Sequence, residues 1–503
     1  MPTTSSTATR SAGTTSTTST TSTSTTNGKH ATSSNAGSNT NTNNNRAITP
    51  KQSQLAWALA IAQFLSLGGY WLMRPLKMGI FVQVVGLEHE PRAKLGTVLL
   101  LVPLLVLYNR LAARTDDIRL VVKIVIGTYA TMFALIGALL FVPSVGFLHD
   151  PNAKAGTHVV KESTLGWCVG WITYWTIETF GSIVMPMFWS VVASVTTDHA
   201  PFVFSRVNTV MQLGAVLGAT LATYAKELGI PQLCFFQVVV LGAVLLASRQ
   251  AFLLSDEIQD EAELAKRKKE DASAPTNATN APHAHHVPKE TSTDLTTGLR
   301  LVFTHPYVAS LLVISTAAEV VSTVMDYQLK VLAQNEYQTP EEMTLLMGRF
   351  GQAVNGVSLL FALFGSRAVM ERFGIRFCLI AFPVCTLLLV GSVFIRPTLG
   401  VVFFGMVAIK ALGYSLNAPS KEMLYRTTSK DIKMQAKSWI DMFGSRNAKA
   451  LGSLVTELLK HNATELFRVG SLFSGGLSLI WLLAAEYLGV TYNRHIQNKT
   501  IVT

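Results

Sequence analysis

One stretch of the sequence decides the fold class: residues 166–195 read GWCVGWITYWTIETFGSIVMPMFWSVVASV and contain a single charged residue, Glu178. About 20 apolar residues are needed for a helix to cross the hydrocarbon layer of a bilayer. A charge at the middle of such a helix costs about 2.5–3.5 kcal/mol. The stretch therefore predicts a membrane-spanning helix in which Glu178 serves transport, or else forms a structural ion pair between helices. We expect the neighbouring Trp175 and Trp189 to line a cavity wall.

The composition of the whole chain agrees with a protein dissolved in lipid. The 503 residues are 49% hydrophobic and only 14% charged, whereas soluble domains carry about 25% charged residues. The net charge of +11 is carried mostly by short loops, where basic residues set the orientation in the membrane. The charge is therefore weak evidence about the substrate, and the alternation of basic and poorer loops predicts that both termini are cytoplasmic.

Long apolar runs recur along the chain and predict about twelve spanning helices in two sets of six. The expected helices lie near residues 54–73, 94–113, 119–142, 165–190, 207–226 and 231–254, and then near 306–326, 351–370, 374–395, 399–418, 436–458 and 466–489. Two six-helix halves around a polar loop resemble the major facilitator architecture, in which the site lies near the bilayer midplane. We therefore predict an all-α polytopic membrane protein with a 6+6, major-facilitator-like arrangement.

The domain organisation follows from the same runs. Residues 1–50 form a Thr/Ser/Asn-rich tail without an acidic residue, which predicts disorder, with an organelle transit peptide as the alternative. The N-terminal half is expected at 51–254 and the C-terminal half at 299–490, followed by a short tail at 491–503. The polar residues 255–298 are expected to form a cytoplasmic linker.

Charges within or beside the predicted helices are the candidate functional residues. Arg74 and Lys77 occur in YWLMRPLKM, three residues apart and on either side of Pro75, so that both lie on one face of a helix. Two cations on one face suit a phosphate or carboxylate ligand, and snorkelling at a helix end is the alternative. Glu319 and Lys410 also fall in predicted helices.

The stretch from Lys410 to Ser453 is the richest in charge. Lys437 and Asp441 are four residues apart, a spacing at which opposite charges pair on one helical face. Lys449 lies further inside the same predicted helix, beside small residues that allow close helix packing. Loop topology does not explain a lysine in that position, so we count it as a candidate ligand.

The motifs of common enzymes and metal sites are missing from the sequence. There is no GxxxxGK[ST] phosphate loop, no HExxH and no nucleophile in a catalytic setting. The four cysteines lack metal-ligand spacing, and the histidines at 283–286 have no evident fourth ligand. We therefore expect neither an enzyme nor a bound metal or cofactor.

Four motifs in order along the chain resemble the nucleotide transporter family of plastids and intracellular bacteria, the ATP/ADP translocases. RPLK at 74–77 resembles the family's LRPLKD, and Glu178 followed by MFW at 187–189 is similar to its ELW…LFW segment. PSKEMLY at 419–425 resembles DPTKEMAY, and KSWID at 437–441 followed by Lys449 resembles KAAIDVV…GKSGG. The chain departs from these motifs at several positions, which include Met78, Pro201, Phe202, Ala418 and Ala448.

The resemblance implies a transporter that exchanges ATP for ADP, and it implies that Lys77, Glu178 and Lys449 matter for transport. Together with the residue patterns it predicts a substrate-binding set with no catalytic residue: Arg74, Lys77, Glu178, Lys437, Asp441 and Lys449. The alternatives are a proton-coupled major-facilitator-type carrier of another anionic metabolite, or a non-transporting membrane protein on the same scaffold. The substrate and the oligomeric state stay open.

The expected partners are a small anionic molecule, of which a nucleotide is the first candidate, and membrane lipid, but no nucleic acid. The expected location is the bacterial inner (cytoplasmic) membrane, with the plastid inner envelope as the alternative.

Overall fold

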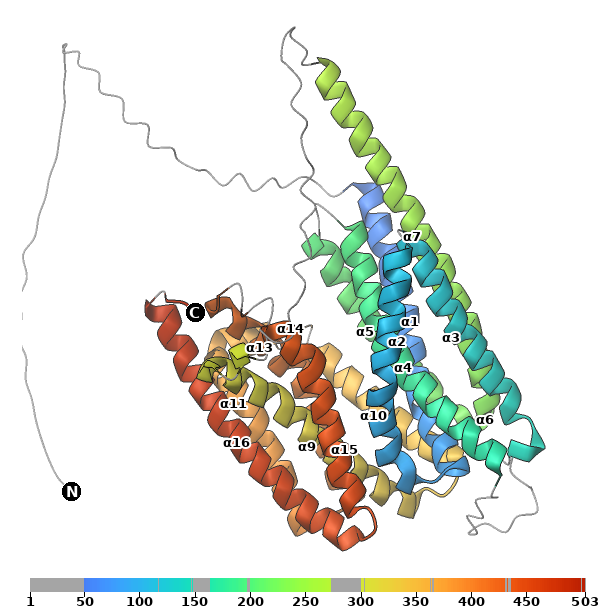
Figure 1. Cartoon of the computed structure of the whole chain (residues 1–503), viewed down its shortest axis with the longest axis vertical. Coiled ribbons are helices and arrows are strands. Elements are labelled where there is room, and N and C mark those ends of the chain that lie inside the picture. Colours follow the sequence, from blue (N-terminus) through green and yellow to red (C-terminus); the bar gives the residue numbers. More distant parts are fainter. Residues whose placement is uncertain are drawn as a thin grey trace, which may run out of the picture. The chain divides into compact units, whose positions relative to one another are not determined.

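The structure is a computed structural model that describes residues 49–502 except 116, 146, 148–162, 197–199, 273–299, 303, 362, 364–365, 430–431, 433–435 and 499. The chain divides into two units, Met1–Ala47 and Ile48–Thr503. The first unit, and with it nearly all of the predicted tail, lies outside the described residues. The second unit contains all the helices described below (Figure 1).

The first half of this unit is built around one long central helix. Its elements are α1 (Pro50–Val84), η1 (Leu87–His89), α2 (Glu90–Arg114), α3 (Ile118–Leu140), η2 (Pro143–Val145), α4 (Thr164–Val195), α5 (Ala200–Ala222), α6 (Ala225–Leu228) and α7 (Ile230–Ala272). Helix α1 packs against α4, α5 and α7. The α1 and α5 backbones approach so closely that a Cβ atom on Gly218 would lie 1.9 Å from the carbonyl oxygen of Gly68. Glycine at such a contact is typical of helix packing in membranes.

The described residues of the second half include the π-helical turns η4 and η7. Its elements are α9 (Pro306–Glu336), α10 (Pro340–Leu360), α11 (Ser366–Ile395), α12 (Leu399–Leu412), π-helix η4 (Gly413–Asn417), α13 (Ala418–Leu424), η5 (Tyr425–Thr427), α14 (Lys437–Trp439), π-helix η7 (Ile440–Gly444), α15 (Ser445–Leu459) and α16 (Ala463–Asn498). Helix α11 packs along α16, and α9 packs against both α15 and α16. Gly374, with φ +77°, interrupts the first part of α11, close to the predicted helix start.

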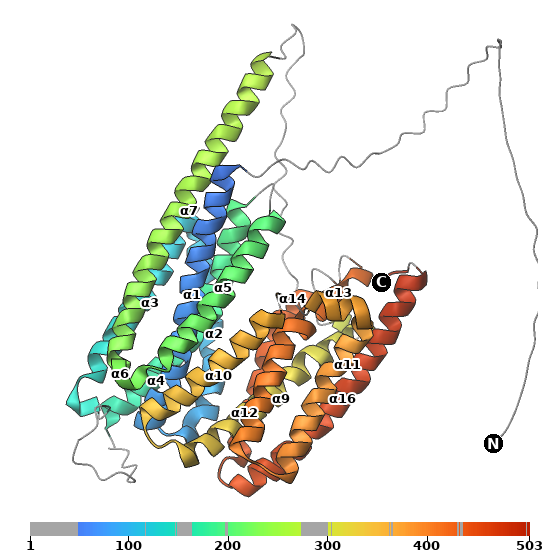
Figure 2. The ribbon, with the colours of Figure 1, turned by 180° about the vertical axis from the view of Figure 1, so that it is seen from behind.

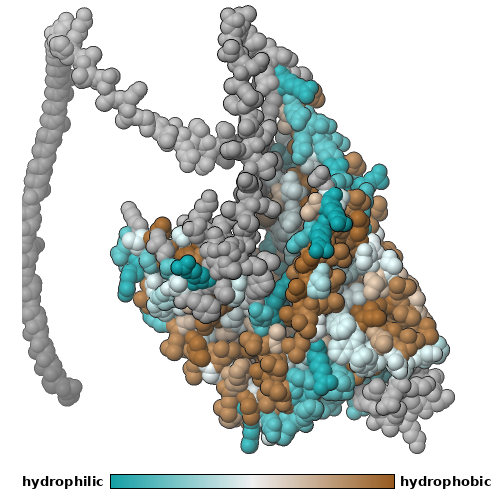
Figure 3. Space-filling model, in the orientation of Figure 1, coloured by the Kyte–Doolittle hydropathy of each residue, from teal (hydrophilic) through white to brown (hydrophobic). Residues whose placement is uncertain are grey.

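Eight helices of the described chain are long and apolar enough to cross a membrane: α1, α2, α3, α4, α7, α9, α11 and α16. Large apolar side chains lie on their outer surfaces, for example Leu99 and Leu107 of α2 and Leu483 of α16. Figure 3 shows the same hydrophobic surface in brown, with hydrophilic residues in teal at the far end of α7. The prediction of an all-helical, multi-pass membrane protein is thereby confirmed for the described residues.

Two helices extend beyond the apolar runs that predict them, because the helical backbone continues through charged residues. Helix α1 was expected to end near 73 but continues through Pro75 to Val84. A proline is tolerated in a membrane helix when neighbouring groups satisfy the freed backbone. Helix α7 was expected to end near 254 but extends to Ala272. Lys51 of α1 holds this extension through Glu257 and Glu261, at 2.9 and 2.7 Å.

Helix α10 begins eleven residues before its predicted start near 351. Thr339 caps it at the N-terminus, and Glu342 bonds back to the Thr339 backbone in a capping box. Helix α10 packs against α1, α5 and α6 of the first half and against α12 of the second, and it lies between the two sets of helices in Figure 2. A Cβ atom on Gly79 of α1 would lie 2.4 Å from the carbonyl oxygen of Pro340. The two halves therefore touch directly at the end where α1 finishes.

The C-terminal residues return to the second half. Val502 forms an isolated parallel β-bridge with Thr428, the only β pairing in the described residues. The Ser429 amide donates to the Val502 carbonyl oxygen at 2.8 Å, and the Val502 amide donates to the Thr427 carbonyl oxygen at 2.7 Å. The bridge thus joins residues 427–429 to the last described residues.

Candidate functional site

A cavity of about 610 Å³ lies between the two halves and collects most of their intramembrane charges. The first half contributes residues from α1, α2, α4 and α5. The second contributes residues from α9, α10, α12, η4, η7 and α15. The charged side chains that line it are Arg74, Lys94, Glu178, Glu319, Asp326, Lys410, Asp441, Arg446 and Lys449. We call this space the central cavity.

The predicted cation and carboxylate of the first half meet at one edge of the central cavity. The Lys77 ammonium group of α1 forms an ion pair with Glu178 of α4. Only 4% of the Lys77 side chain is exposed, against 29% for Glu178. The Lys77 Nζ also lies 4.2 Å from the centre of the Tyr174 ring, at a distance where a cation is attracted to the ring face. Lys77 lines a side pocket of about 60 Å³ that shares Arg74 and Glu178 with the central cavity.

Three cations of the central cavity lack a carboxylate partner within 4.0 Å in the described part of the chain: Arg74, Lys410 and Arg446. The Arg74 guanidinium lies over the Trp71 ring, 4.9 Å from its centre. Lys449 has Glu319 at 3.9 Å, at the limit of an ion pair, and 59% of its side chain is exposed. These four groups are therefore available to an anionic ligand.

A second group of charges joins the two halves at the edge of the central cavity, which two of its members, Lys94 and Asp326, also line. Glu90 and Lys94 of α2 meet Asp326 and Lys330 of α9, and we call these four residues the inter-half ion cluster. Lys330 lies 2.5 Å from Glu90 and 2.7 Å from Asp326, and Lys94 lies 3.1 Å from Glu90 and 2.9 Å from Asp326. The Glu90 side chain is fully buried, and that of Lys330 is 6% exposed. Each cation of the cluster thus touches both carboxylates.

Further polar contacts extend the cluster toward α15. Arg92 of α2 lies 2.6 Å from Glu457, which also pairs with Lys460 at 2.8 Å. The Lys460 ammonium donates to the backbone carbonyl of Glu88 at 3.0 Å. These contacts lie at the same end of the cavity as the contact between α1 and α10. That end of the cavity is therefore closed by packing and by ion pairs.

Five of the six predicted site residues lie in or beside the central cavity. Arg74, Glu178, Asp441 and Lys449 line it, and Lys77 lines the side pocket. Lys437 does not line either space. It pairs with Glu422 at 2.6 Å and faces the Tyr425 ring.

The predicted pairing of Lys437 with Asp441 is wrong, because Lys437 pairs instead with Glu422. The substrate contact predicted for Lys437 stays a prediction. The prediction that Trp175 and Trp189 line a cavity wall is also wrong, since neither is among the described residues that line the central cavity. The Trp175 indole N–H donates to the Ala93 carbonyl oxygen at 3.1 Å, and the Trp189 ring stacks on Phe204.

The sequence reasoning missed the inter-half ion cluster. Lys94 and Asp326 fall on the first and last residues of predicted helices, where charges are expected to meet water. A signal was present, because Glu90 with Lys94 and Asp326 with Lys330 are both opposite charges at i,i+4 spacing. Two such pairs at the ends of helices in opposite halves mark a possible contact between those halves.

Comparison with known proteins gives a family and a fold. The model of the family described as TLC ATP/ADP transporter matches residues 54–492. A comparison with curated proteins gave no match.

Solved structures with a similar fold include a bacterial homologue of the iron transporter ferroportin in an inward-facing state, with a TM-score of 0.54, 12% identity and coverage of 88% of this chain and 98% of that chain. They also include a D-xylose–proton symporter, with a TM-score of 0.52, 12% identity and coverage of 87% and 97%. Identities this low show the fold alone, and the major-facilitator-like fold is as predicted.

Proposed function

This chain belongs to the TLC ATP/ADP transporter family, and on that premise we propose that it exchanges nucleotides of the ATP/ADP type by alternating access. Family and fold make it a multi-pass membrane protein and a carrier of a small molecule. The exchange mode and the roles of individual residues are the proposed part.

The observation that carries the proposal is the set of available cations in the central cavity. Arg74, Lys410, Arg446 and Lys449 come from both halves, and three of them have no carboxylate partner in the described residues. A phosphate chain offers several oxygens with negative charge. Arginine binds such oxygens with two parallel donors and lysine binds them as a point charge. Contact with both halves at once is what a substrate needs to influence their relative movement.

The Lys77–Glu178 pair gives the empty carrier a resting arrangement. Without a substrate Glu178 neutralises Lys77, which is nearly fully buried. A phosphate oxygen that enters beside Arg74 offers Lys77 a second anionic partner. Glu178 then gives up part of its contact, so that binding changes the pairing at the junction of α1 and α4. The substrate is thereby coupled to the helices that move.

The inter-half ion cluster explains why exchange is favoured over net uptake. The closed end opens only if Glu90 and Lys94 separate from Asp326 and Lys330. Separation of a buried ion pair costs about 3–5 kcal/mol. A ligand shifts such an equilibrium by the difference between its affinities for the two states. We infer that nucleotide bound across both halves offsets this cost, whereas the empty carrier does not switch.

The proposed orientation follows from the distribution of basic loops. With both termini cytoplasmic, the end where α1 meets α2 faces outward, and the closed end is the outer one. The proposed location is a bacterial inner membrane, with a plastid inner envelope as the alternative.

Exchange is tested with the purified full chain in proteoliposomes. Vesicles loaded with ADP should take up labelled ATP with saturation, and vesicles without internal nucleotide should take up at most about a tenth as much. A proton uncoupler should leave the rate unchanged. Uptake that collapses with the uncoupler supports the proton-coupled carrier instead. If no nucleotide is taken up under any loading, the proposed exchange is wrong.

A further inference from the structure

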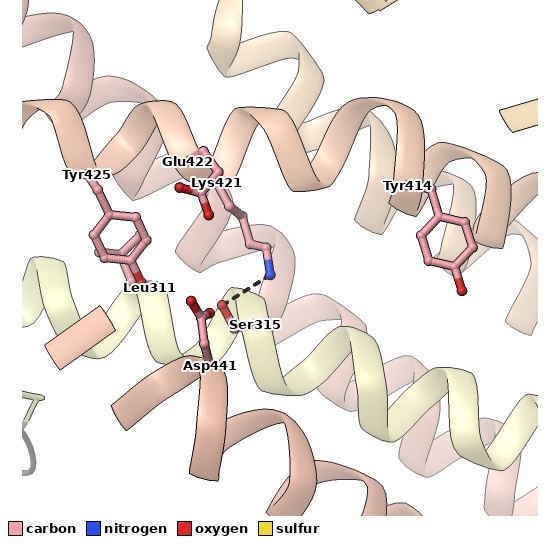
Figure 4. A pocket seen from close by; sticks show the side chains of 7 residues that line it. All are labelled: Leu311, Ser315, Tyr414, Lys421, Glu422, Tyr425 and Asp441. Atoms are coloured by element: carbon pink, nitrogen blue, oxygen red, sulfur yellow. Dashed lines mark hydrogen bonds between the residues drawn. The ribbon is translucent and has the colours of Figure 1, made fainter. Parts of the chain in front are cut away.

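A second cavity adjoins the central cavity inside the C-terminal half. It has a volume of about 350 Å³ and is lined by Leu311, Ser315, Tyr414, Lys421, Glu422, Tyr425 and Asp441 (Figure 4). Tyr414 and Asp441 also line the central cavity. The two spaces therefore meet at these two side chains, and we call the second space the annex.

Both junction residues are carried by π-helical turns. Tyr414 lies in the turn Gly413–Asn417, and Asp441 lies in the turn Ile440–Gly444. A π turn inserts an extra residue into a helix, is rare, and occurs frequently at functional sites. The two turns carry the two side chains that line both spaces, and in Figure 4 Tyr414 lies at the other end of the annex from Asp441. This placement is independent of the annex volume, and it singles out Tyr414 and Asp441.

The charges of the annex differ from those of the central cavity. Asp441 has no cation within 4.0 Å in the described part of the chain, whereas Glu422 is held by Lys437 at 2.6 Å. The Lys421 ammonium donates to the Ser315 hydroxyl at 3.5 Å, and Figure 4 shows Lys421 extending across the annex toward the segment that carries Asp441. A carboxylate without its own cation repels a phosphate group and accepts hydrogen bonds from hydroxyl groups. Pairing of an acidic side chain with a ribose hydroxyl is the established solution in dinucleotide-binding folds.

The aromatic groups of the annex complete a nucleoside-shaped environment. The Tyr414 residue is 52% exposed, so part of its side chain is accessible to a base. Tyr425 is buried and faces the Lys437 ammonium group, so it forms part of the wall. Stacking of a base on an aromatic side chain is worth about 1–3 kcal/mol.

We propose that the annex holds the nucleoside part of the substrate, with Asp441 as the acceptor for the ribose hydroxyl groups and Tyr414 as the stacking surface for the base. The phosphate chain then extends into the central cavity past Arg446 and Lys449 and across it toward Arg74 of the first half. Lys449 lies two helical turns after Asp441, about 12 Å along the axis, a distance that a ribose triphosphate can bridge. This inference rests on the proposed function, and it makes Asp441 a residue that selects ribonucleotides over deoxynucleotides.

The test compares nucleotides that differ only in the sugar. ATP, 2′-deoxy-ATP, 3′-deoxy-ATP and 2′,3′-dideoxy-ATP compete against labelled ATP for exchange in ADP-loaded proteoliposomes, with inorganic triphosphate as a ligand that has no nucleoside. The wild-type protein should prefer ATP over the dideoxy analogue by about tenfold or more, because a site built for a hydroxyl group rejects a ligand without it. Asp441→Asn should reduce this ratio to about threefold or less.

The matched control is Glu422→Gln, an acid of the same annex that is already held by Lys437, and it should keep the wild-type sugar ratio. Tyr414→Leu should weaken competition by ATP about tenfold and leave competition by inorganic triphosphate unchanged. If Asp441→Asn is inactive in exchange, its preference for ATP over the dideoxy analogue is measured instead from the thermal stabilisation that each nucleotide gives the purified variant.

The two possible failures are distinct. A wild-type protein that takes up no nucleotide overturns the proposed function, and the annex assignment falls with it. A wild-type protein that exchanges ATP but does not distinguish the dideoxy analogue overturns the annex assignment alone. The same conclusion follows if Asp441→Asn and Glu422→Gln have equal sugar ratios.

Discussion

The inter-half ion cluster and the central cavity contain the same kinds of side chain in opposite arrangements. In the cluster, two lysines and two carboxylates lie 2.5–3.1 Å apart and each cation touches both acids. In the cavity, Lys449 has its carboxylate at 3.9 Å, and Arg74, Lys410 and Arg446 have none within 4.0 Å in the described residues. The difference teaches that a charged side chain inside a membrane protein stabilises a contact between helices where an opposite charge lies beside it. Where no opposite charge lies beside it, the side chain is available to bind a ligand.

The Lys77–Glu178 pair shares features of both regions, because its two charges are paired and yet adjoin the central cavity. A substitution in this pair should have the largest effect on exchange. Lys77→Gln leaves Glu178 without its partner and removes the cation that the substrate recruits. Loss of a buried partner costs about 3–5 kcal/mol, so exchange of labelled ATP should fall by about 100-fold or more. The rate of exchange in ADP-loaded proteoliposomes measures the effect.

The matched control for Lys77→Gln is Lys51→Gln, which removes an exposed cation from the same helix. It should change the rate by less than about twofold. Equal rates for Lys77→Gln and the wild-type protein, with equal amounts of folded protein by gel filtration, would contradict the coupling role of this pair.

The closing role of the inter-half ion cluster is tested by Glu90→Gln. This change leaves Lys94 and Lys330 to share Asp326, and it should destabilise the closed end by about 3–5 kcal/mol. The reporter is Thr97→Cys in the cavity wall, in a protein whose four native cysteines are replaced. A membrane-impermeant maleimide added at the closed end should label it at least about tenfold faster than in the parent.

Glu88→Gln, at the same end but on an exposed side chain, is the control for Glu90→Gln and should leave the labelling rate unchanged. Unaltered labelling in Glu90→Gln would show that packing of α10 against α1, rather than the ion cluster, closes this end.

A smaller effect is expected where a cavity cation is removed without leaving a buried partner. Arg446→Gln should raise the KM for ATP by about tenfold and change the maximal rate little, because a charge-assisted hydrogen bond contributes about 1.5–3 kcal/mol. The KM for ATP should also rise with ionic strength in the wild-type protein, since open charges are screened by salt. Arg468→Gln, at an exposed position of α16, should leave the KM unchanged.

The smallest effect is expected for a matched pair on the surface. Arg376 pairs with Glu486 between α11 and α16, and both side chains are substantially exposed. Arg376→Gln should lower stability by only about 0–1 kcal/mol and should not alter exchange. The thermal midpoint of the purified protein and its exchange rate test this. A large loss of thermal stability or of exchange rate would mean that solvent exposure does not distinguish ion pairs of little effect from those that matter for stability or exchange.

The sequence was sufficient for the all-helical fold class and for singling out several charges of the central cavity, because apolar runs of membrane length and lone charges inside them are local patterns. Arg74, Lys77, Glu178 and Lys449 were singled out in this way and lie in or beside the central cavity, and their contact with a substrate stays a prediction. The inter-half ion cluster was not singled out, since its residues lie at the ends of predicted helices and its meaning depends on which helices of opposite halves touch. The start of α10 was missed because the acidic residues of its capping box were taken for loop.

The two π-helical turns were not predicted from the sequence, and neither was the pairing of Lys437 with Glu422. Sequence spacing assumes 3.6 residues per turn, and on that assumption Lys437 and Asp441 share a face. In the structure Lys437 pairs with Glu422, and Asp441 lines the central cavity. No residue pattern marked these turns in advance, because their stability depends on tertiary contacts.

The bridge between Val502 and Thr428 has a practical consequence for anyone who produces this protein. It lies three residues after Tyr425, which forms a wall of the annex. A fluorescent or affinity fusion attached directly after Val502 would strain the pairing of Val502 with Thr428 and disturb the nearby annex wall at Tyr425. A fusion at the amino end leaves the bridge untouched, and any comparison of sugar analogues is best made with that design.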